Sequence, residues 1–510
     1  MDCVIAVDAG TTGVRALAVD EVGTVVDVAY RELTQHYPRP GWVEHDATQI
    51  WDHVRSTVTE VAMRRHEVGS AVSAIGITNQ RETVVAWDRR SGRPLHRAIV
   101  WQDRRTAEMC DALRAQGHLD LVRSRTGLVL DPYFSATKMA WLLSHGLTPG
   151  PDLVLGTVDA WVTWNLTGGP DGGVLATDAS NASRTLLYDI HERRWSEELC
   201  ELFGVPMGAL AEVVPSCGRV GTVVAAVSDT PGGDGALAGV PVSAMAGDQQ
   251  AALFGQACFT PGMAKVTYGT GSFVLLHVGD TPPPPTEGLL TTVAWDLGAH
   301  GGDSPVAYAL EGAVFATGAA IQWLRDGLGI IGDASEIEAL AASVPSTEGV
   351  HVVPAFAGMG SPWWDPYARG TVSGLSRGVG RAHIARAVVE AMAFQVRDVV
   401  DAMRLAAGRD VRALRVDGGA SVMGMLLQLQ ADQVRVPVCR PATAETTALG
   451  AATMAGLAEG MWGSLEELSD LWKLEAEYVP RAGVAGVDGV HGAWLAAVAR
   501  ARAWAPSDGS

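Results

Sequence analysis

Residues 4–19 read VIAVDAGTTGVRALAV, and this stretch decides the fold class of the chain. Its two apolar runs, Val4–Val7 and Val14–Val19, predict short strands, because apolar runs bounded by turn residues are typical of buried strands. The segment between them, DAGTTG, supplies the glycines of a tight turn. A third run, Val25–Ala29, extends the pattern to three consecutive strands.

The same arrangement recurs near the middle of the chain. Ala264–Tyr268 and Phe273–Val278 predict two strands joined by a GTGS turn. Strands and helices alternate after both units, which predicts an α/β fold with a weak internal duplication. We therefore expect two similar α/β domains facing one another, 1–254 and 255–510, with the boundary near Gln250–Gly262.

Hydrophobic periodicity predicts further elements along the chain. The additional predicted strands are Ala74–Thr78, Leu153–Gly156 and Ala413–Val416. The predicted helices are Ile50–Arg64, Ala107–Gly117, Lys138–His145, Val158–Leu166, Ala313–Leu328, Ile384–Leu405, Met423–Gln433 and Gly492–Trp504. The proline-rich run Thr281–Thr286 is typical of a surface loop rather than of a linker.

Composition and charge restrict the class of protein. A chain of 510 residues is too long for one ordinary core. Its net charge of −19 disfavours binding to nucleic acid or to an anionic membrane. No segment approaches the ~18 apolar residues of a membrane span, and the N-terminus lacks the basic region of a signal peptide. The six cysteines lie far apart without metal-ligand spacing, so we expect reduced thiols and a cytoplasmic protein.

The turn after the first strand has the chemistry of a phosphate site. Its glycine N–H groups can cradle phosphate oxygens, Thr11 and Thr12 add hydroxyl donors, and Asp8 can hold Mg²⁺ through water. An ordinary β-turn has a similar composition, so this turn alone does not distinguish a phosphate site from a structural turn. Two more turns, T267-Y-G-T-G-S-F273 and D417-G-G-A-S421, also follow predicted strands. Together the three turns favour a nucleotide site between the two halves.

Charged residues follow two other predicted strands. Arg81 and Glu82 stand at the sheet edge where α/β proteins place ligands, and as donor and acceptor they can bind adjacent alcohols. A solvated surface pair is the plainer alternative. Asp248 follows a small-residue strand and can accept the proton of an attacking hydroxyl. A helix cap is the alternative reading of this aspartate.

The order of these motifs resembles that of a known family. DxGTT, GDQ, YGTG and DGG occur in the same order in the FGGY carbohydrate kinases, a branch of the actin/Hsp70-like ATPases. Longer strings resemble the glycerol kinases of that family over nearly the whole chain from Val4 to about Pro480. They are G41-W-V-E-H-D46, I75-G-I-T-N-Q-R-E-T83, A98-I-V-W-Q-D-R-R-T106, D131-P-Y-F-S135, A246-G-D-Q-Q-A-A-L-F-G255, A309-L-E-G-A-V-F315, P362-W-W-D-P-Y-A-R-G370 and E445-T-T-A-L-G-A-A452.

The resemblance implies a fold, a reaction and a set of site residues. It implies two ribonuclease H-like domains of the actin-like ATPase type with a cleft between them. The implied reaction is the Mg·ATP-dependent phosphorylation of glycerol to sn-glycerol 3-phosphate, in glycerol uptake and catabolism, with Asp248 as the catalytic base. The first domain would bind the polyol and the second the nucleotide. A homo-oligomer, dimer or tetramer, is expected.

Individual residues take their expected roles from the same resemblance. The polyol-binding residues would be Arg81, Glu82, Trp101, Tyr133, Asp248, Gln249 and Phe273. The nucleotide-binding residues would be Thr11, Thr12, Gly13, Arg15, Thr270, Gly318, Gln322, Gly419 and Met423. Asp8 and Asp248 would contact Mg²⁺, partly through water. Helix packing is an equally good reading of Gly318 and Gln322.

The chain departs from the family pattern at several positions. Ala9 and Val14 replace polar residues and Gly13 replaces a serine, so the first turn keeps its backbone donors but loses hydroxyls. Met423 replaces an asparagine on the adenine side, and a thioether packs on a base without a strong hydrogen bond.

Regulation is expected to differ from that of some family members. Ser228–Val240 has no Lys or Arg, and no histidine lies between His191 and His277. Inhibition by fructose bisphosphate and activation by histidine phosphorylation are therefore expected to be absent.

Two other functions fit parts of the sequence. A kinase for another polyol or sugar, such as xylulose, ribulose or gluconate, would use the same scaffold with more hydrogen-bonding groups around a longer substrate. An actin- or chaperone-like ATPase would use the nucleotide only to change shape. The Arg81–Glu82 pair with its aromatic neighbours weighs against this second alternative.

Overall fold

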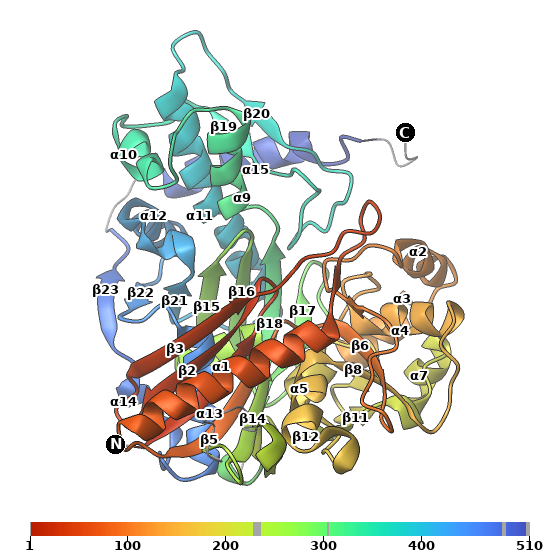
Figure 1. Ribbon diagram of the computed structural model, residues 1–510. Coiled ribbons are helices and arrows are strands. Elements are labelled where there is room, and N and C mark those ends of the chain that lie inside the picture. The colour runs from red at the N-terminus through yellow and green to blue at the C-terminus, as the bar shows by residue number, and fades with distance from the viewer. Residues whose placement is uncertain (1, 228–235, 303–304, 482–485, 506–510) are drawn as a thin grey trace.

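The structure is a computed structural model that describes residues 2–227, 236–302, 305–481 and 486–505. Two large twisted sheets form its two halves, with helices around and between them (Figure 1). A smaller sheet with its own helices lies to one side of the first half, at the right of the view. The predicted α/β class is confirmed.

The first sheet has the strand order β13-β14-β5-β1-β2-β3. Its strands are β1 (Cys3–Ala9), β2 (Gly13–Asp20), β3 (Val25–Glu32), β5 (Val72–Asn79), β13 (Cys217–Thr222) and β14 (Pro241–Gly247). β1, β2 and β3 pair antiparallel, whereas β5 runs parallel to both β1 and β14. The carboxyl ends of β1, β5 and β14 therefore meet at one edge of the sheet.

The second sheet repeats this connectivity. Its order is β17-β18-β16-β15-β21-β22-β23. Its strands are β15 (Met263–Tyr268), β16 (Ser272–Gly279), β17 (Leu290–Asp296), β18 (Val306–Val314), β21 (Ala413–Asp417), β22 (Val438–Pro441) and β23 (Leu474–Tyr478). β15, β16 and β18 pair antiparallel, and β21 runs parallel to β15 and β22. β15 and β16 thus correspond to β1 and β2, as the internal duplication predicts.

The remaining strands are short. The side sheet has the order β4-β7-β6-β8. Its strands are β4 (Glu44–His45), β6 (Val84–Asp88), β7 (Ala98–Ile99) and β8 (Leu153–Thr157). Three two-stranded pairs contain β9 (Ala176–Asp178) with β12 (Glu212–Val214), β10 (Tyr188–Asp189) with β11 (Arg194–Trp195), and β19 (His351–Val353) with β20 (Thr371–Ser373).

Helices cover both faces of the sheets. In the first half they are α1 (Ala47–Glu67), α2 (Ala107–Ala115), α3 (Leu119–Thr126), α4 (Ser135–Ser144), α5 (Val158–Leu166), α6 (Ala179–Ala182), α7 (Glu197–Phe203) and α8 (Asp248–Gly255). In the second half they are α9 (Gly318–Gln322), α10 (Glu336–Ala342), α11 (Arg381–Ala407), α12 (Gly424–Val434), α13 (Thr446–Ala458), α14 (Leu465–Leu471) and α15 (Val487–Ala501). No helix in the described ranges is long and apolar enough to span a bilayer.

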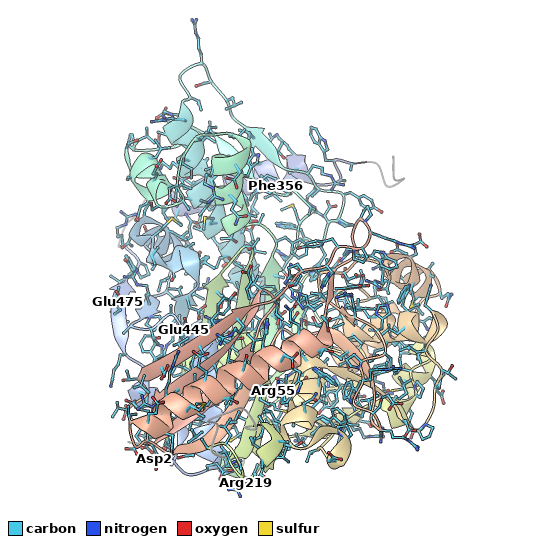
Figure 2. The ribbon with its side chains drawn as sticks, viewed as in Figure 1. Asp2, Arg55, Arg219, Phe356, Glu445 and Glu475 are labelled. Carbon is cyan, nitrogen blue, oxygen red and sulfur yellow. The ribbon has the colours of Figure 1, made fainter. Side chains whose placement is uncertain are left out.

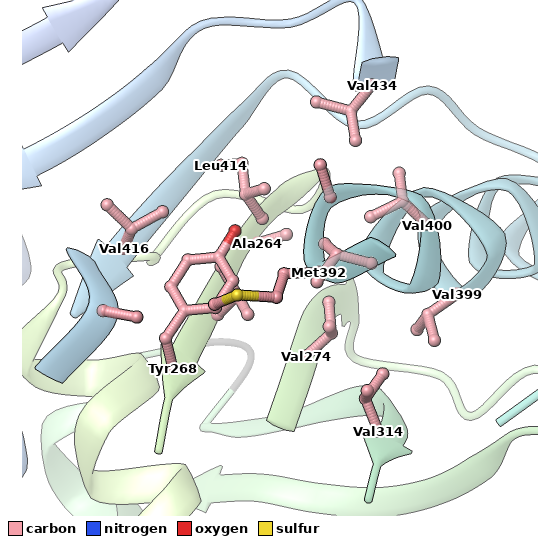
Figure 3. Packing of buried hydrophobic residues seen from close by; sticks show 14 of the residues in the cluster. Ala264, Tyr268, Val274, Val314, Met392, Val399, Val400, Leu414, Val416 and Val434 are labelled. Carbon is pink, nitrogen blue, oxygen red and sulfur yellow. The ribbon is translucent and has the colours of Figure 1, made fainter. Parts of the chain in front are cut away.

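The core of the second half lies between its sheet and α11. Figure 3 shows Val274 and Val314 of the sheet facing Met392 and Val399 of α11, with Tyr268 at one end of the cluster. The Tyr268 hydroxyl is buried and donates a hydrogen bond of 2.9 Å to Gln430 Oε1 of α12. This satisfied hydroxyl lets a large ring fill the space beneath the YGTG turn without an unpaired polar atom.

Among the predicted helices, two differ most from the structure in their boundaries. Residues 313 and 314 belong to β18, which pairs with β16 and β17, and the helix starts only at Gly318. The last helix begins at Val487 rather than Gly492 and ends at Ala501. The run Thr281–Thr286 lies in a loop, as predicted, and all six cysteines are free.

Two helices exchanged between the halves form the centre of the molecule. α13 belongs to the second half by sequence but packs on β1, β5 and β14 of the first sheet and on α8. Glycines allow this approach: a Cβ on Gly450 of α13 would lie 1.8 Å from the Ala251 carbonyl oxygen of α8. A Cβ on Gly255 of α8 would lie 1.9 Å from the Thr446 oxygen. Only glycine permits such backbone contact.

We predict that Gly450→Ala lowers the free energy of unfolding by about 1–3 kcal/mol, because the added methyl group overpacks the α8–α13 contact. Gly492→Ala is the matched control, since Gly492 is also inside a helix but its Cβ would meet nothing within 4 Å. This control should keep or raise stability by up to about 1 kcal/mol through helix propensity. Thermal and denaturant unfolding of both variants checks the prediction, and equal stability of the two would contradict it.

Candidate active site

The ends of three parallel strands bring the predicted catalytic and polyol residues together. Asp8 lies at the end of β1, Arg81 and Glu82 follow β5, and Asp248 follows β14 as the first residue of α8. Because β5 is parallel to both neighbours, these side chains project from the same sheet edge. These groups lie close enough to change the pKa of Asp248: Arg81 and Lys265 lower it, and Asp8 raises it.

The first phosphate turn is held by the half that contains it. Gly10 N–H donates to the Gly13 oxygen, which closes the turn, and the Trp101 indole donates to the Thr11 hydroxyl at 2.9 Å. Thr12 is exposed and Thr11 partly exposed, so their donors are available to a ligand. Glycine at position 13 has a local structural explanation, because a Cβ there would lie 2.3 Å from the Tyr30 ring.

Arg81 is the most heavily bonded residue of the site. Its Nη1 donates to Glu311 at 2.5 Å and to Gln250 at 3.2 Å, and its Nη2 donates to Tyr133 and Glu311. Its Nε lies 3.3 Å from Asp248 Oδ1. Each nitrogen therefore already faces a protein acceptor, so a polyol hydroxyl would have to share or replace one of these contacts.

Glu82 has an unusual backbone conformation. Its φ of 60° is in the left-handed region, which a non-glycine residue adopts at a cost and which is frequent at functional sites. The side chain is buried and accepts a hydrogen bond of 2.7 Å from Arg184 Nε. Burial raises the pKa of Glu82, while Arg81 and Arg184 act against that shift. The second arginine thus favours the charged form of this buried carboxylate.

Aromatic rings surround this charged pair. Trp101 and Tyr133 form an edge-to-face contact with ring centroids 5.6 Å apart. The Phe273 ring of β16 lies 5.9 Å from the Arg81 guanidinium carbon. These rings can pack against the C–H groups of a small polyol while Tyr133 and the charged groups bind its hydroxyls. The structure therefore brings Arg81, Glu82 and all three predicted aromatic residues into one site.

Asp248 is the most accessible carboxylate of the cluster. Its side chain is 31% exposed, compared with 1% for Glu82 and 7% for Asp8. Burial raises the pKa of Asp248, Arg81 and Lys265 oppose the shift, and Asp8 adds to it. An accessible carboxylate with a raised pKa is suited to accept a proton from a bound hydroxyl.

Lys265 connects Gln249 with the second half of the site. Its ammonium group, buried in β15, donates to Gln249 Oε1 at 2.5 Å and to the Thr267 hydroxyl at 2.8 Å. Burial lowers the pKa of Lys265 to about 8, while Asp417 and Asp248 favour its charged form. Gln249 is thereby held at the start of α8, beside Asp248.

Arg15 joins the first turn to α13. Its guanidinium lies between Asp8 Oδ2 at 2.6 Å and Glu445 Oε2 at 2.8 Å, where Glu445 is the N-cap residue of α13. Figure 2 labels Glu445 between β21 of the second half and β3 of the first. Burial raises the pKa of Asp8 and Arg15 opposes this shift. Arg15 is 37% exposed, so a phosphate can approach it from the solvent side.

The turns predicted for the nucleotide in the second half contact one another. Gly318 N–H, at the start of α9, donates to the Gly269 oxygen, and Ala319 N–H donates to the Thr270 oxygen, both at 3.0 Å. A Cβ on Gly418 would lie 2.5 Å from the Tyr268 oxygen, so the DGG turn packs on the YGTG turn. Thr270, Gly318 and Gly419 therefore belong to one cluster of turns.

The outer nucleotide residues differ in accessibility. Gln322 is exposed at the end of α9, and a Cβ on Gly419 would meet no atom within 4 Å. Met423 is only 6% exposed and packs in the core next to α12. Most of the Met423 thioether therefore contacts protein atoms rather than solvent. Residues 228–235 of the glycine-rich segment considered for regulation are outside the described residues.

The carboxylates present fit a magnesium ion held jointly with a nucleotide. Within the described part of the chain, no group of three or more His, Cys, Asp or Glu side chains could hold a metal ion. Mg²⁺ normally takes one or two carboxylates and completes its shell with phosphate oxygens and water. Asp8 and Asp248 would supply those two carboxylates.

Three buried charges of the site were not singled out from the sequence. They are Arg184, Lys265 and Glu311, none of them more than 1% exposed. A signal was available for two of them, because Lys265 and Glu311 are lone charges inside predominantly apolar runs, MAKVTY and VAYALEGAV. A charge in a buried strand needs a partner. Arg184 follows α6 and carries no comparable signal.

Comparison with known proteins assigns the family. Sequence models of the FGGY family of carbohydrate kinases match residues 3–255 with the N-terminal domain and residues 264–459 with the C-terminal domain. The chain belongs to this family.

Its relatives include glycerol kinases. One from Trichlorobacter lovleyi is 51% identical over 99% of this chain and 100% of its own length. The Plasmodium falciparum glycerol kinase, solved with ADP, has a TM-score of 0.91 at 32% identity and covers 98% of both chains. A xylulose kinase from Rhodospirillum rubrum has a TM-score of 0.85 at 26% identity, again over 98% of both chains.

We predict that Arg184→Met lowers the free energy of unfolding by about 3–5 kcal/mol, because it leaves Glu82 and Glu311 buried with one arginine between them. Arg90→Met is the control, since Arg90 also pairs with a carboxylate, Asp152, but is 79% exposed. That exposed pair should contribute at most about 1 kcal/mol. Denaturant unfolding measures both, and a mild effect of Arg184→Met would show that the buried cluster is not needed for stability.

Proposed function

We propose that this protein transfers the γ-phosphoryl group of ATP to glycerol and forms sn-glycerol 3-phosphate in glycerol uptake and catabolism. The observation that carries the proposal is the 51% identity to a glycerol kinase over essentially the full length of both chains. A compact polar site with aromatic walls supports the same conclusion. Such a site suits a three-carbon triol, which has a C–H face and several hydroxyls.

Asp248 acts as the catalytic base in this proposal. Phosphoryl transfer to an alcohol needs positioning, charge neutralisation and one proton acceptor. Asp248 accepts the proton of the attacking hydroxyl at its carboxylate, and the nearby Arg81 guanidinium favours the ionised form before the transfer. The remaining polyol contacts come from Arg81, Glu82, Trp101, Tyr133, Gln249 and Phe273.

The nucleotide binds the turns of both halves. Thr11, Thr12, Gly13 and Arg15 contact the phosphates from the first half, and Thr270, Gly318, Gln322, Gly419 and Met423 bind the nucleotide from the second. Asp8 and Asp248 would hold Mg²⁺, partly through water, and the bound ion would neutralise phosphate charge. Arg15 offsets negative charge near the transferring phosphoryl group.

The proposed division of labour follows the two halves of the chain. Residues 1–254 supply most of the polyol contacts and the first phosphate turn, and residues 255–510 supply the rest of the nucleotide site. Closure of the cleft between them excludes water. A homo-oligomer, dimer or tetramer, in the cytoplasm is the expected state of the enzyme. Loss of activity in the presence of fructose bisphosphate would contradict the expected lack of that regulation.

Asp248→Asn should lower kcat by about 10²–10⁴-fold, because the amide cannot accept the proton of the attacking hydroxyl. The fold should persist, since Asp248 is partly exposed and begins a helix. Asp326→Asn, a change at an exposed aspartate outside the site, is the control and should retain kcat. A coupled ADP-release assay with saturating glycerol measures both. Near-normal turnover of Asp248→Asn would remove Asp248 from its proposed role.

Glycerol should be the substrate with the highest kcat/KM among small polyols and sugars. The panel contains glycerol, four- and five-carbon polyols, xylulose, ribulose and gluconate, each assayed with Mg·ATP at equal enzyme concentration. Preference for a sugar would place the protein in another branch of the same family. Equal rates of ATP hydrolysis with and without polyol would instead support an actin- or chaperone-like ATPase that uses the nucleotide to change shape.

A further inference from the structure

One carboxylate of the second half holds two arginines of the first half. Glu311 lies in β18 and is fully buried. Its Oε2 accepts from Arg81 Nη1 at 2.5 Å, and its Oε1 accepts from Arg81 Nη2 at 3.1 Å and from Arg184 Nη2 at 2.8 Å. The contact with Arg81 is thus bidentate, a geometry that fixes the plane of the guanidinium as well as its position.

The charges around Glu311 balance. Arg81 and Arg184 carry two positive charges, and Glu82 and Glu311 carry two negative charges, all within side chains at most 2% exposed. Burial alone would raise the pKa of Glu311, but Arg184 and Arg81 outweigh it and hold the pKa at about 2. Glu311 is therefore ionised at every pH at which the protein is expected to work.

β18 also leads directly to the nucleotide turns. Ala313, two residues after Glu311, pairs with Phe273 of β16, whose ring faces Arg81. After Val314 the chain crosses to Thr317, whose N–H donates to the Thr270 oxygen at 2.9 Å, and α9 begins at Gly318. The strand that holds Arg81 therefore continues directly into α9 and its contact with the Thr270 turn.

A second contact across the halves supports the same connection. Gln250 Oε1 accepts from Arg81 Nη1, and Gln250 Nε2 donates to the Thr292 hydroxyl of β17 at 3.0 Å. β17 is the neighbour of β18 in the second sheet. Arg81, although part of the first half, therefore has most of its hydrogen-bonding partners in or tied to the second.

We propose that Glu311 is a positioning residue that makes polyol binding and nucleotide binding interdependent, by orienting Arg81 from the strand that continues into the nucleotide turns. The proposal rests on the proposed function of the site. Glu311 does not need to touch either substrate; it acts through Arg81. Since coupling between two binding sites is reciprocal, ADP changes the affinity for glycerol by the same factor as glycerol changes the affinity for ADP.

The test measures this coupling factor. Isothermal titration gives the Kd of glycerol without and with saturating ADP, and the Kd of ADP without and with glycerol. In the unchanged protein the two ratios should agree and differ from one. Glu311→Gln should weaken glycerol binding by about 10–100-fold, the usual effect of losing hydrogen bonds between charged groups, and bring both ratios to one. ADP binding alone should stay within a few-fold of the unchanged protein.

A matched control separates this role from general stabilisation. Glu459 at the end of α13 accepts from Arg219 of β13, so it also forms an ion pair across the halves, but outside the site. Figure 2 labels Arg219 at the bottom of the molecule, far from the upper ends of β2 and β3. Glu459→Gln should lower the melting temperature slightly and leave both ratios unchanged. If it removes the coupling as fully as Glu311→Gln, the proposal is overturned.

A double variant covers the case in which Glu311→Gln does not fold. Arg184→Gln combined with Glu311→Gln removes one charge of each sign and keeps the buried cluster neutral. This variant should fold and also lose the coupling. The proposal is overturned if either folded variant keeps the glycerol affinity and the coupling of the unchanged protein. It is also overturned if the unchanged protein itself shows Kd ratios of one. If the substrate panel identifies another polyol, the proposed glycerol kinase function is wrong. The same titrations with that polyol then test the role of Glu311 separately.

Discussion

The close packing of α8 against α13 is the constraint on which the arrangement of the site depends. The two helices lie between the sheets, and Gly255 and Gly450 let their backbones touch. α8 begins with Asp248 and Gln249, and α13 is preceded by its N-cap residue Glu445, whose side chain binds Arg15. Because both helices are fixed by backbone contact rather than by flexible side chains, their N-terminal ends hold Asp248, the proposed base, and the Asp8–Arg15 turn in a fixed relative position.

The sheets and the turns were predictable because their signals are local. Apolar runs bounded by glycine give the positions of β1, β2, β15 and β16 within one or two residues. The recurrence of the Gly/Thr turn predicts the duplication that the strand orders confirm. The position of Asp248 and of the Arg81–Glu82 pair at strand ends was also enough to place them at one sheet edge.

What the sequence did not predict involves partners far apart in the chain. Residues 313–314 have the apolar composition of a helix, but pairing with Phe273 and Ser272 of β16 makes them a strand. The exchange of α13 onto the first sheet and the contact of Glu311 with Arg81 join residues from opposite halves. No periodicity predicts such contacts, so the resemblance supplied the candidate site residues but not the buried charges behind them.

The contact of Gly13 with Tyr30 makes the composition of the first turn a joint property of two positions. The Tyr30 ring occupies the volume that a side chain at position 13 would need. A serine there would require either that the half-exposed Tyr30 ring turn away or that position 30 carry a smaller residue, so the two positions constrain each other. Positions 13 and 30 should therefore covary among family members. Introducing a serine at position 13 alone would measure the steric conflict with Tyr30 rather than the effect of a hydroxyl on phosphate affinity.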